Sequence, residues 1–406
     1  MNSWNQVVPI RWTGLPLELL RGTPFNCLVE GGGEGASALK AVKPDESGSF
    51  TVPYFAKRDQ VRWTDDSPVA AIGDNSWPGL AQSDAATAGP TNAPWIDSNN
   101  WYARLVRQSA PGRTLWLAFD PPAKGATIPG EAYIRAMADA EAMGARWIVS
   151  LDEGLRKGMA AGNPGALATW GKIAGAAGLF ARHPEWRAYE ACGAVGVMSD
   201  FAGENEEMSH ELLNLFSRRN VPFRILGKSQ PWTGVKALVA LDREVGGEEV
   251  RRKLLDFARE GGLLVVRGKW PDSGTILDRS HPRLEVRSLG KGRLAVAKDG
   301  ALDPFLVVRD THMLLGRRND LVRFYNISAF LSNYCTSADG TRDLLHLITF
   351  APPRDVITAW FRRPYKAASL WEPGASEARR LEVVPENGGV AVGLPAVAAY
   401  AAVELS

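Results

Sequence analysis

The chain has 406 residues, of which 45% are hydrophobic and 23% are charged, and its 47 Lys and Arg residues nearly balance its 45 Asp and Glu residues. This composition is typical of a folded globular protein and excludes a disordered chain. The near-neutral charge balance removes the electrostatic case for nucleic acid or an anionic membrane as a partner. No apolar stretch approaches the roughly 18 residues that cross a bilayer.

The first residues show no basic segment followed by an apolar one, so the sequence predicts no signal peptide. We therefore expect a cytoplasmic protein, or an extracytoplasmic one if a signal has been removed. Three cysteines lie far apart without a CxxC pair, and five histidines are scattered without the i, i+4 spacing of a helical metal site. The sequence thus predicts no disulfide framework, no metal site and no cofactor.

The first 190 residues alternate short apolar runs with helical patterns. Strands are predicted at 23–30, 50–55, 68–74, 114–120 and 145–152, and helices at 99–108 and 131–143. Runs this apolar are typical of parallel strands that are covered on both faces. Strand, helix and strand in this order build βαβ units, but the span is short for eight full repeats. We therefore predict a compact or incomplete (β/α) TIM-type barrel.

Two further domains are predicted after the barrel. Residues 191–300 alternate strands with the helices 206–219 and 248–260, which indicates a doubly wound, flavodoxin-like α/β domain. Residues 301–406 contain mainly strand-like runs, with turn residues at 387–389, and indicate a β-sandwich. The predicted domains are therefore 1–190, 191–300 and 301–406.

This order of domains resembles the β-galactosidases of glycoside hydrolase family 42. The resemblance is clearest in Phe180-Ala-Arg-His-Pro-Glu-Trp186, which leads into a strand at 193–200, and in the hairpin at 290–296. It implies a catalytic barrel, a class I glutamine amidotransferase-like domain that supports trimerisation, a C-terminal β domain and a carbohydrate substrate. A homo-oligomer, by analogy a trimer, is therefore expected.

Two departures from that family's pattern limit what the resemblance implies. The turn at 266–270 offers neither Cys nor Ser as a nucleophile, so the amidotransferase-like domain is expected to be structural. The family's Asn-Glu pair occurs here only as Asn205-Glu206, which lies in the second domain. No catalytic residue is therefore carried over from the family.

Carboxylates follow three of the predicted barrel strands, where barrel enzymes carry their chemistry. Glycoside hydrolysis needs two carboxyl groups across the scissile bond. The candidate catalytic residues are Asp74, Asp120, Asp152 and Glu153. Among them we favour Asp120 and Asp152, and the alternative for each residue is a helix N-cap or a loop hydrogen bond.

The loop at 89–101 combines two indoles with amide and carboxylate groups, which suits a sugar site with stacking and hydroxyl-binding groups. Together with the nearby indole of the segment 74–77, it supplies the candidate substrate-binding residues Trp77, Asn92, Trp95, Asp97, Asn99 and Trp101. The alternative is a rigid loop whose polar side chains bind its own backbone. The turn at 199–205 lies where open α/β sheets bind ligands, but Asp200 and Glu204 there are expected to favour a helix N-terminus.

The sequence therefore predicts a glycoside hydrolase-like protein that acts on a carbohydrate through paired carboxylates at barrel strand ends. The alternative is a non-catalytic carbohydrate-binding or scaffold protein on a degenerate glycosidase barrel. A thiol enzyme is disfavoured because Cys192 precedes its strand.

Overall fold

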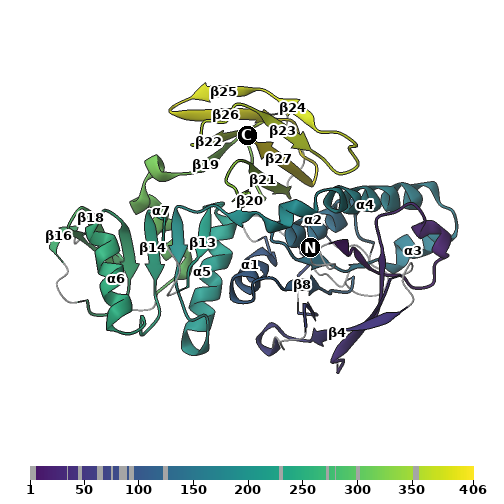
Figure 1. The fold of residues 1–406 in the computed structure, drawn as a ribbon, viewed down its shortest axis with the longest axis horizontal. Coiled ribbons are helices and arrows are strands. Elements are labelled where there is room, and N and C mark those ends of the chain that lie inside the picture. Colours follow the sequence, from purple (N-terminus) through teal and green to yellow (C-terminus); the bar gives the residue numbers. More distant parts are fainter. Residues whose placement is uncertain are drawn as a thin grey trace.

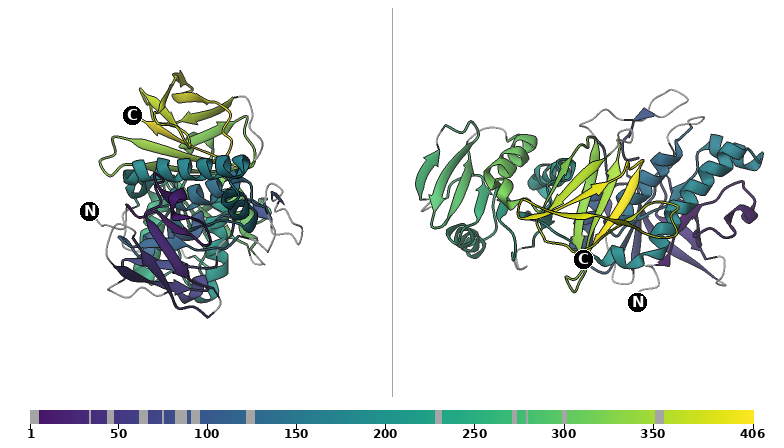
Figure 2. Two further views of the ribbon diagram at one scale, coloured as in Figure 1. Left: turned by 90° about the vertical axis from the view of Figure 1, so that its right-hand side faces the viewer. Right: turned by 90° about the horizontal axis from the view of Figure 1, so that it is seen from above.

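The computed structural model describes residues 6–33, 35–43, 48–61, 67–74, 76–81, 89–90, 96–121, 127–227, 232–270, 274–278, 280–298, 302–350 and 356–406. A barrel with its helices forms one end of the molecule, and a sheet flanked by helices forms the other (Figure 1). Two further sheets lie above both and, seen from above, cover the place where they meet (Figure 2). These bodies are called the barrel unit, the middle unit and the C-terminal unit.

The barrel unit is built on an eight-stranded sheet that closes on itself. In sheet order its strands are β10 (Val149–Ser150), β1 (Pro9–Arg11), β2 (Cys27–Gly31), β3 (Ala38–Val42), β4 (Ser49–Phe55), β5 (Val69–Ile72), β8 (Thr114–Leu117) and β9 (Arg146–Trp147). Because β9 pairs with β8 and β10 pairs with β1, the segment 146–150 joins the two edges of the sheet. The predicted barrel is therefore present.

Helices cover only part of this barrel. They are α1 (Asn100–Ser109), α2 (Gly130–Glu141), α3 (Glu153–Ala160) and α4 (Pro164–Arg182). In the described residues before α1, the helical segments are the single turns η2 (Leu17–Leu20) and η3 (Arg58–Gln60). The predicted helices at 99–108 and 131–143 thus correspond to α1 and α2, and the barrel lacks α-helical covering along the described part of its first strands.

The barrel differs from the expected parallel arrangement in one region. Strands β2, β3 and β4 pair antiparallel, and the sequence analysis did not predict β3. The residues of β3 alternate between buried and less buried, since Leu39 and Ala41 face the interior while Lys40 is exposed. Such alternation is typical of a strand with one solvated face rather than of a fully covered parallel strand.

The middle unit contains a seven-stranded sheet. In sheet order its strands are β13 (Phe223–Ile225), β12 (Val195–Val197), β14 (Ala237–Ala240), β15 (Leu263–Val266), β18 (Gly292–Ala297), β17 (Leu284–Leu289) and β16 (Thr275–Asp278). The first five strands are parallel, and the last two form antiparallel pairs. Its helices are α5 (Glu206–Arg218), α6 (Glu248–Arg259) and α7 (Pro304–Leu315).

Helix α7 corrects the expectation that little after residue 300 is helical. It packs against α5, β14 and β15 of the middle unit. Its start follows ordinary helix rules, because Asp303 Oδ1 accepts the backbone N–H of Phe305 at 2.8 Å and Pro304 occupies the first helical position.

The C-terminal unit consists of two antiparallel sheets that share an apolar core. The six-stranded sheet contains β11 (Glu190–Ala191), β20 (Phe330–Thr336), β21 (Asp343–Thr349), β27 (Tyr400–Leu405), β23 (Ala368–Trp371) and β24 (Arg379–Leu381). The four-stranded sheet contains β19 (Val322–Tyr325), β22 (Ile357–Phe361), β26 (Gly389–Leu394) and β25 (Val383–Glu386). Leu347, Phe361 and Val392 are among the buried residues between them.

The side chains of Arg104 and Asn333 connect the three units by hydrogen bonds. Arg104 of α1 donates to the carbonyl of Phe223 at 2.7 Å and to Oδ1 of Asn333 at 2.9 Å. Asn333 in turn donates to the carbonyl of Ala142 at 2.7 Å. Burial lowers the pKa of Arg104 to about 10, although the guanidinium keeps its charge at neutral pH. Within the described ranges, no helix is both long and apolar enough to span a membrane.

Candidate functional site

The carboxyl ends of the barrel strands bring together Arg11, Ser150 and Asp120. Arg11 ends β1 and Ser150 ends the neighbouring β10, while Asp120 follows β8. A guanidinium nitrogen of Arg11 forms an ion pair with Oδ1 of Asp120, and Ser150 Oγ donates to the same oxygen at 3.3 Å. The Asp120 side chain is 65% exposed. The Asp120 carboxylate is therefore accessible to solvent and lies next to a cation.

Asp152 lies after β10 but has different surroundings. It is 2% exposed, and its Oδ1 accepts the backbone N–H of Leu155 at 2.9 Å, as the N-cap of α3. Its Oδ2 accepts from the Tyr133 hydroxyl at 2.9 Å and from the Ile128 N–H at 3.3 Å. Both carboxylate oxygens of Asp152 thus accept hydrogen bonds within the protein interior. Glu153, in the first turn of α3, forms an i, i+4 ion pair of 2.7 Å with Lys157 on the surface.

Trp77 is part of the barrel interior. Its side chain is almost fully buried and contacts the rings of Tyr133 and Trp147 edge-on, at centroid distances of 5.0 and 5.3 Å. Its indole N–H donates to the backbone carbonyl of Asp120 at 3.3 Å. The indole therefore supports the loop that carries Asp120, and it offers little free face for stacking.

A cavity of about 810 Å³ lies between the barrel unit and the middle unit. On the barrel side it is bounded by the loops that follow β4 and β5 and by α1. On the other side it is bounded by the turn after β12 and the first turns of α5. Carboxyl ends of strands from two sheets, the usual location of ligand sites in both architectures, therefore face one space.

Four carboxylates and three aromatic residues contribute to the lining of this cavity. They are Asp59, Asp74, Asp200, Glu206, Trp101, Tyr102 and Phe201. Of the predicted catalytic residues, only Asp74 lies here. Of the predicted substrate-binding residues that the structure describes, only Trp101 does. Asp74 and Asp120 follow the paired strands β5 and β8, and of the two only Asp74 lines this cavity.

Arg58 is the central cation of the cavity wall. Its guanidinium lies 5.3 Å from the centroid of Trp101 and 5.2 Å from that of Tyr102. It donates to the backbone carbonyl of Asp74 at 2.8 Å and to Oδ1 of Asn99 at 3.0 Å. Burial lowers the pKa of Arg58, and the charges of Asp74 and Asp139 partly oppose that effect.

Asn99 and Asp139 support Arg58 from below. Asn99 is fully buried and donates its backbone N–H to Oδ2 of Asp139 at 2.6 Å and its side-chain N–H to the Ser76 carbonyl at 2.7 Å. Burial raises the pKa of Asp139 to about 7, although the hydrogen bonds from Asn99 lower it. The structure thus gives Asn99 a supporting position beneath the cavity, where its amide has no access to a ligand.

The loop before α1 is fixed by contacts with the middle unit. Asp97 is exposed and forms an ion pair of 3.2 Å with Arg218, which also donates to the carbonyl of Ile96 at 3.1 Å. Asn99 is the N-cap residue of α1, and the carboxylate of Asp97 bonds Arg218. Asn92 and Trp95 lie outside the described residues.

The turn after β12 closes the cavity from the other side. Asp242 accepts from Ser199 Oγ at 2.6 Å and from the backbone N–H of Asp200 at 3.0 Å. Phe201 adopts the left-handed backbone region, with φ of 54°, and its N–H donates to Ser199 Oγ at 3.0 Å. The Asp200 carboxylate accepts from the side chain of Asn205 at 3.2 Å. The turn is therefore held in a defined shape, as expected for a strand-to-helix connection.

His210 completes the cavity wall. Its ring lies 5.0 Å from that of Trp101, and its Nδ1 lies 3.9 Å from a carboxylate oxygen of Glu206. Burial lowers the pKa of His210, while the charge of Glu206 raises it in part. The imidazole is therefore neutral at neutral pH and can accept or donate a hydrogen bond.

The sequence analysis missed three residues that shape these two places. Arg11 ends β1 and Arg58 begins η3 shortly after β4, so a position near a strand end is a usable signal for cations as well as for carboxylates. His210 was taken as isolated because its partners Trp101 and Glu206 come from a different unit and from one helical turn away. Only the folded structure reveals the contact between His210 and Trp101.

No protein family model matches the chain, and no curated protein matches its sequence. Solved structures do match. A β-galactosidase from Bacillus circulans sp. alkalophilus gives a TM-score of 0.53 at 11% identity, over 83% of this chain and 60% of that one. A GH42 β-galactosidase from G. stearothermophilus gives 0.52 at 11% identity over the same shares. Alpha-L-fucosidase isoenzyme 2 from Paenibacillus thiaminolyticus gives 0.52 at 14% identity, over 76% of this chain and 62% of that one.

These matches show what the chain shares with the three enzymes. The barrel with its further sheets has a glycosidase-type fold, and it resembles the GH42 β-galactosidases. At 11–14% identity the likeness concerns the fold alone. The chain spans about 60% of the length of these solved proteins.

Proposed function

We propose that the protein binds a carbohydrate in the cavity between the barrel unit and the middle unit, on a barrel derived from a glycoside hydrolase. The observation that carries this proposal is the composition of the cavity wall, in which Trp101 and Tyr102 lie beside Asp74, Glu206 and His210. Carboxylate and imidazole groups bind sugar hydroxyls, and aromatic edges exclude water from the apolar face of a ring. The volume of about 810 Å³ accommodates one or two sugar rings.

The proposal follows the binding alternative because two of the four predicted catalytic carboxylates have structural partners. Asp152 is buried as a helix cap, and Glu153 pairs with Lys157. Asp74 lines the cavity, and Asp120, which follows the neighbouring strand β8, pairs with Arg11. The solved relatives in fold are glycosidases, which supports a carbohydrate as the ligand class.

Titration calorimetry with a panel of mono- and disaccharides, chosen first by glycan array, tests the proposal. We expect saturable binding by the wild type and a loss of about tenfold or more in Asp74→Asn, because a buried sugar hydroxyl loses a charged acceptor. Asp256→Asn is the matched control, since this exposed aspartate of α6 lies outside the cavity wall. Equal loss in both variants, or no binding of any sugar by the wild type, would contradict the proposal.

A second candidate function is glycoside hydrolysis at the barrel mouth, and the contact between Asp120, Arg11 and Ser150 favours it. The Arg11 guanidinium supplies a countercharge to the Asp120 carboxylate, and a nucleophile or a base must be ionised. Hydrolysis of a panel of aryl glycosides, galactosides included, by the wild type and Asp120→Asn separates the two functions. Release by the wild type that the variant abolishes would establish the enzyme. Turnover that survives in the variant would exclude Asp120 from the chemistry.

We also propose the finer architecture. The parallel strand order β13-β12-β14-β15 supports a flavodoxin-like, class I glutamine amidotransferase-like domain at 191–300, to which α7 adds a helix. The two facing sheets support a β-sandwich at 301–406, and the barrel domain is 1–190. By analogy with family 42, the middle domain supports a trimer. Sedimentation velocity tests that assembly, and a monomer at micromolar concentration would contradict it.

A further inference from the structure

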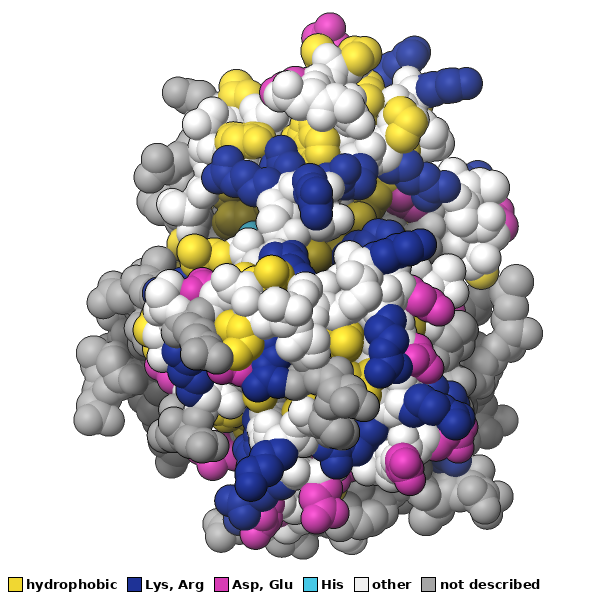
Figure 3. Space-filling model, turned by 90° about the vertical axis from the view of Figure 1, so that its left-hand side faces the viewer, with side chains coloured by type: hydrophobic (Ala, Val, Ile, Leu, Met, Phe, Trp, Pro, Cys, Tyr) yellow, Lys and Arg dark blue, Asp and Glu magenta, His cyan; other side chains and the backbone are white. Residues whose placement is uncertain are grey.

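A second cavity, of about 270 Å³, lies where the middle unit meets the C-terminal unit. Its wall comes from the residues after α5, the last turn of α7, the short helix η6 (Arg317–Asn319), β19 and the start of β20. None of its lining residues belongs to the barrel sheet. Figure 3 shows this side of the molecule, where Lys and Arg side chains gather along a hollow with a hydrophobic floor.

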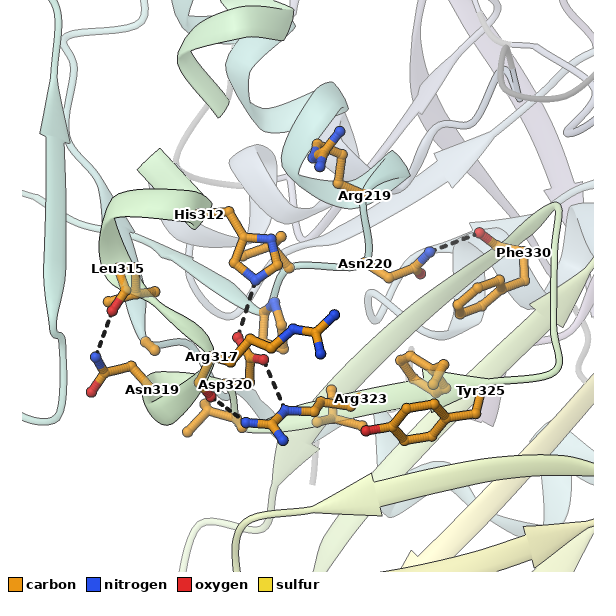
Figure 4. A pocket seen from close by; sticks show the side chains of 16 residues that line it. Arg219, Asn220, His312, Leu315, Arg317, Asn319, Asp320, Arg323, Tyr325 and Phe330 are labelled. Carbon is orange, nitrogen blue, oxygen red and sulfur yellow. Dashed lines mark hydrogen bonds and ion pairs between the residues drawn. The ribbon is translucent and has the colours of Figure 1, made fainter. Parts of the chain in front are cut away.

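Three arginines from different elements contribute to the wall of this cavity. Arg219 follows α5, Arg317 begins η6 and Arg323 lies in β19. The side chain of Arg317 extends into the middle of the cavity, between His312 and Asn220 (Figure 4). Within the described part of the chain, no residue forms a hydrogen bond or ion pair with the guanidinium of Arg317.

Arg219 is a second cation without a compensating charge. Its Nε is buried and has no hydrogen-bond partner among the described residues, and its guanidinium lies 5.8 Å from the centroid of Phe305. Burial and the charge of Arg309 both lower the pKa of Arg219. Because Phe305 belongs to the first turn of α7 and does not line the cavity, the guanidinium of Arg219 is not part of the oxyanion site.

The single carboxylate in the wall is already neutralised. Asp320 Oδ1 lies 3.0 Å from Nε2 of His312, and its Oδ2 accepts from Nε of Arg323 at 2.9 Å. Burial raises the pKa of Asp320, but these two hydrogen bonds outweigh it and hold the pKa below its ordinary value. Asp320 therefore leaves the charge of Arg317 uncompensated.

The rest of the wall suits a ring that carries a hydroxyl. The ring of Tyr325 is 44% exposed, and the rings of Phe324 and Phe330 stack edge-on at 4.8 Å. The side-chain oxygen of Asn220 is buried without a partner among the described residues, while its amide donates to the Phe330 carbonyl at 3.1 Å. An unpaired buried acceptor requires a donor, and a ligand hydroxyl would supply one.

We propose that this cavity is a binding site for a small sugar bearing one phosphate or sulfate ester. The oxyanion lies against Arg317, because a guanidinium group binds such oxygens in a bidentate manner. The sugar ring lies against Tyr325, and a hydroxyl donates to Asn220. The cavity volume allows one ring. The site uses none of the residues of the proposed carbohydrate cavity, so either proposal can fail without the other.

Titration calorimetry with glucose 6-phosphate, glucose 6-sulfate, inorganic phosphate and glucose tests the site. We expect the wild type to bind one ester or both, and the stronger of the two identifies the oxyanion. Arg317→Ala should weaken binding about tenfold or more, because a charge-assisted bidentate contact is lost. Arg318→Ala is the matched control, since this neighbouring exposed arginine does not line the cavity.

A labelling experiment gives a second readout on the unaltered protein. Phenylglyoxal modifies exposed arginines, and mass spectrometry should show that the better ester protects Arg317 while leaving Arg318 reactive. Tyr325→Ala should weaken the sugar ester and leave inorganic phosphate unchanged. Equal losses in Arg317→Ala and Arg318→Ala would overturn the proposal. It would also be overturned by tight binding of glucose alone, or by no binding or protection at millimolar ester concentrations.

Discussion

Replacing Asp139 by asparagine should change how stability depends on pH. Asp139 is fully buried, its Oδ2 accepts from Asn99, and its Oδ1 has no partner among the described residues. Burial raises its pKa from the ordinary value of 3.8 to about 7, against the opposing hydrogen bonds. The folded protein therefore holds a proton that the unfolded chain releases at lower pH. Its stabilising contribution is complete below about pH 4 and is lost as the pH rises to about 7.

The size of this effect follows from the pKa shift. Roughly 1.4 kcal/mol per pKa unit gives at most about 4 kcal/mol between acidic and neutral pH. The substituted asparagine side chain would stay uncharged and keep an acceptor for Asn99. The variant Asp139→Asn should therefore match the wild type below about pH 4 and exceed it in stability at pH 8.

Urea unfolding at several pH values, followed by tryptophan fluorescence, measures this difference. The probe suits the barrel, because ten of the 14 tryptophans precede residue 190. Subtracting the variant from the wild type cancels the titration of all other groups. Asp97→Asn, which removes a largely exposed ion pair with Arg218, should stay within about 1 kcal/mol of the wild type at every pH. Parallel curves for the wild type and Asp139→Asn, or a variant that is less stable at pH 8, would refute the argument.

Three further predictions concern other contacts. Asp152→Ala should lower the free energy of unfolding by about 2–3 kcal/mol, because it removes a helix cap and leaves buried donors unpaired. Urea titration measures this loss, and an unchanged free energy of unfolding would show that the carboxylate is dispensable. A double-mutant cycle of Arg11→Met and Asp120→Asn should give a coupling of about 0.2–1 kcal/mol in the free energy of unfolding, since Asp120 is largely exposed. A coupling several times larger would contradict that reasoning. Burial raises the pKa of Cys27 and Cys192 to about 12. After brief treatment of the native protein with iodoacetamide at pH 8, mass spectrometry should therefore find both thiols unmodified. Rapid alkylation would contradict their burial.

The sequence predicted those elements of the barrel whose signals are local. Strands β4, β5 and β8 and helices α1 and α2 lie close to their predicted ranges, because apolar runs and helical spacing depend only on neighbouring residues. The turn at 387–389 is also present, with Asn387 and Gly388 both at positive φ between β25 and β26. Strand β1, with three residues, is too short to give a periodic pattern.

The candidate site was less accessible from sequence. Asp74, Asp120 and Asp152 do follow barrel strands, as expected, but what each carboxylate does depends on its partners. Asp152 bonds the start of its own helix, while Arg11, 109 positions away in sequence, pairs with Asp120. The cavity between α1 and α5 is formed by two units. The residue pattern of either helix alone therefore does not indicate it.

The segment 146–150 has a consequence for synthesis of the chain. Its first half bonds β8 and its second half bonds β1, so Ile10 finds its partner Val149 only after both have left the ribosome. Until then one edge of β1 and one edge of β8 expose unpaired backbone groups, which can recruit strands from other nascent chains. The barrel should therefore close late, and translation pausing shortly before residue 146 would prolong exposure of the open sheet.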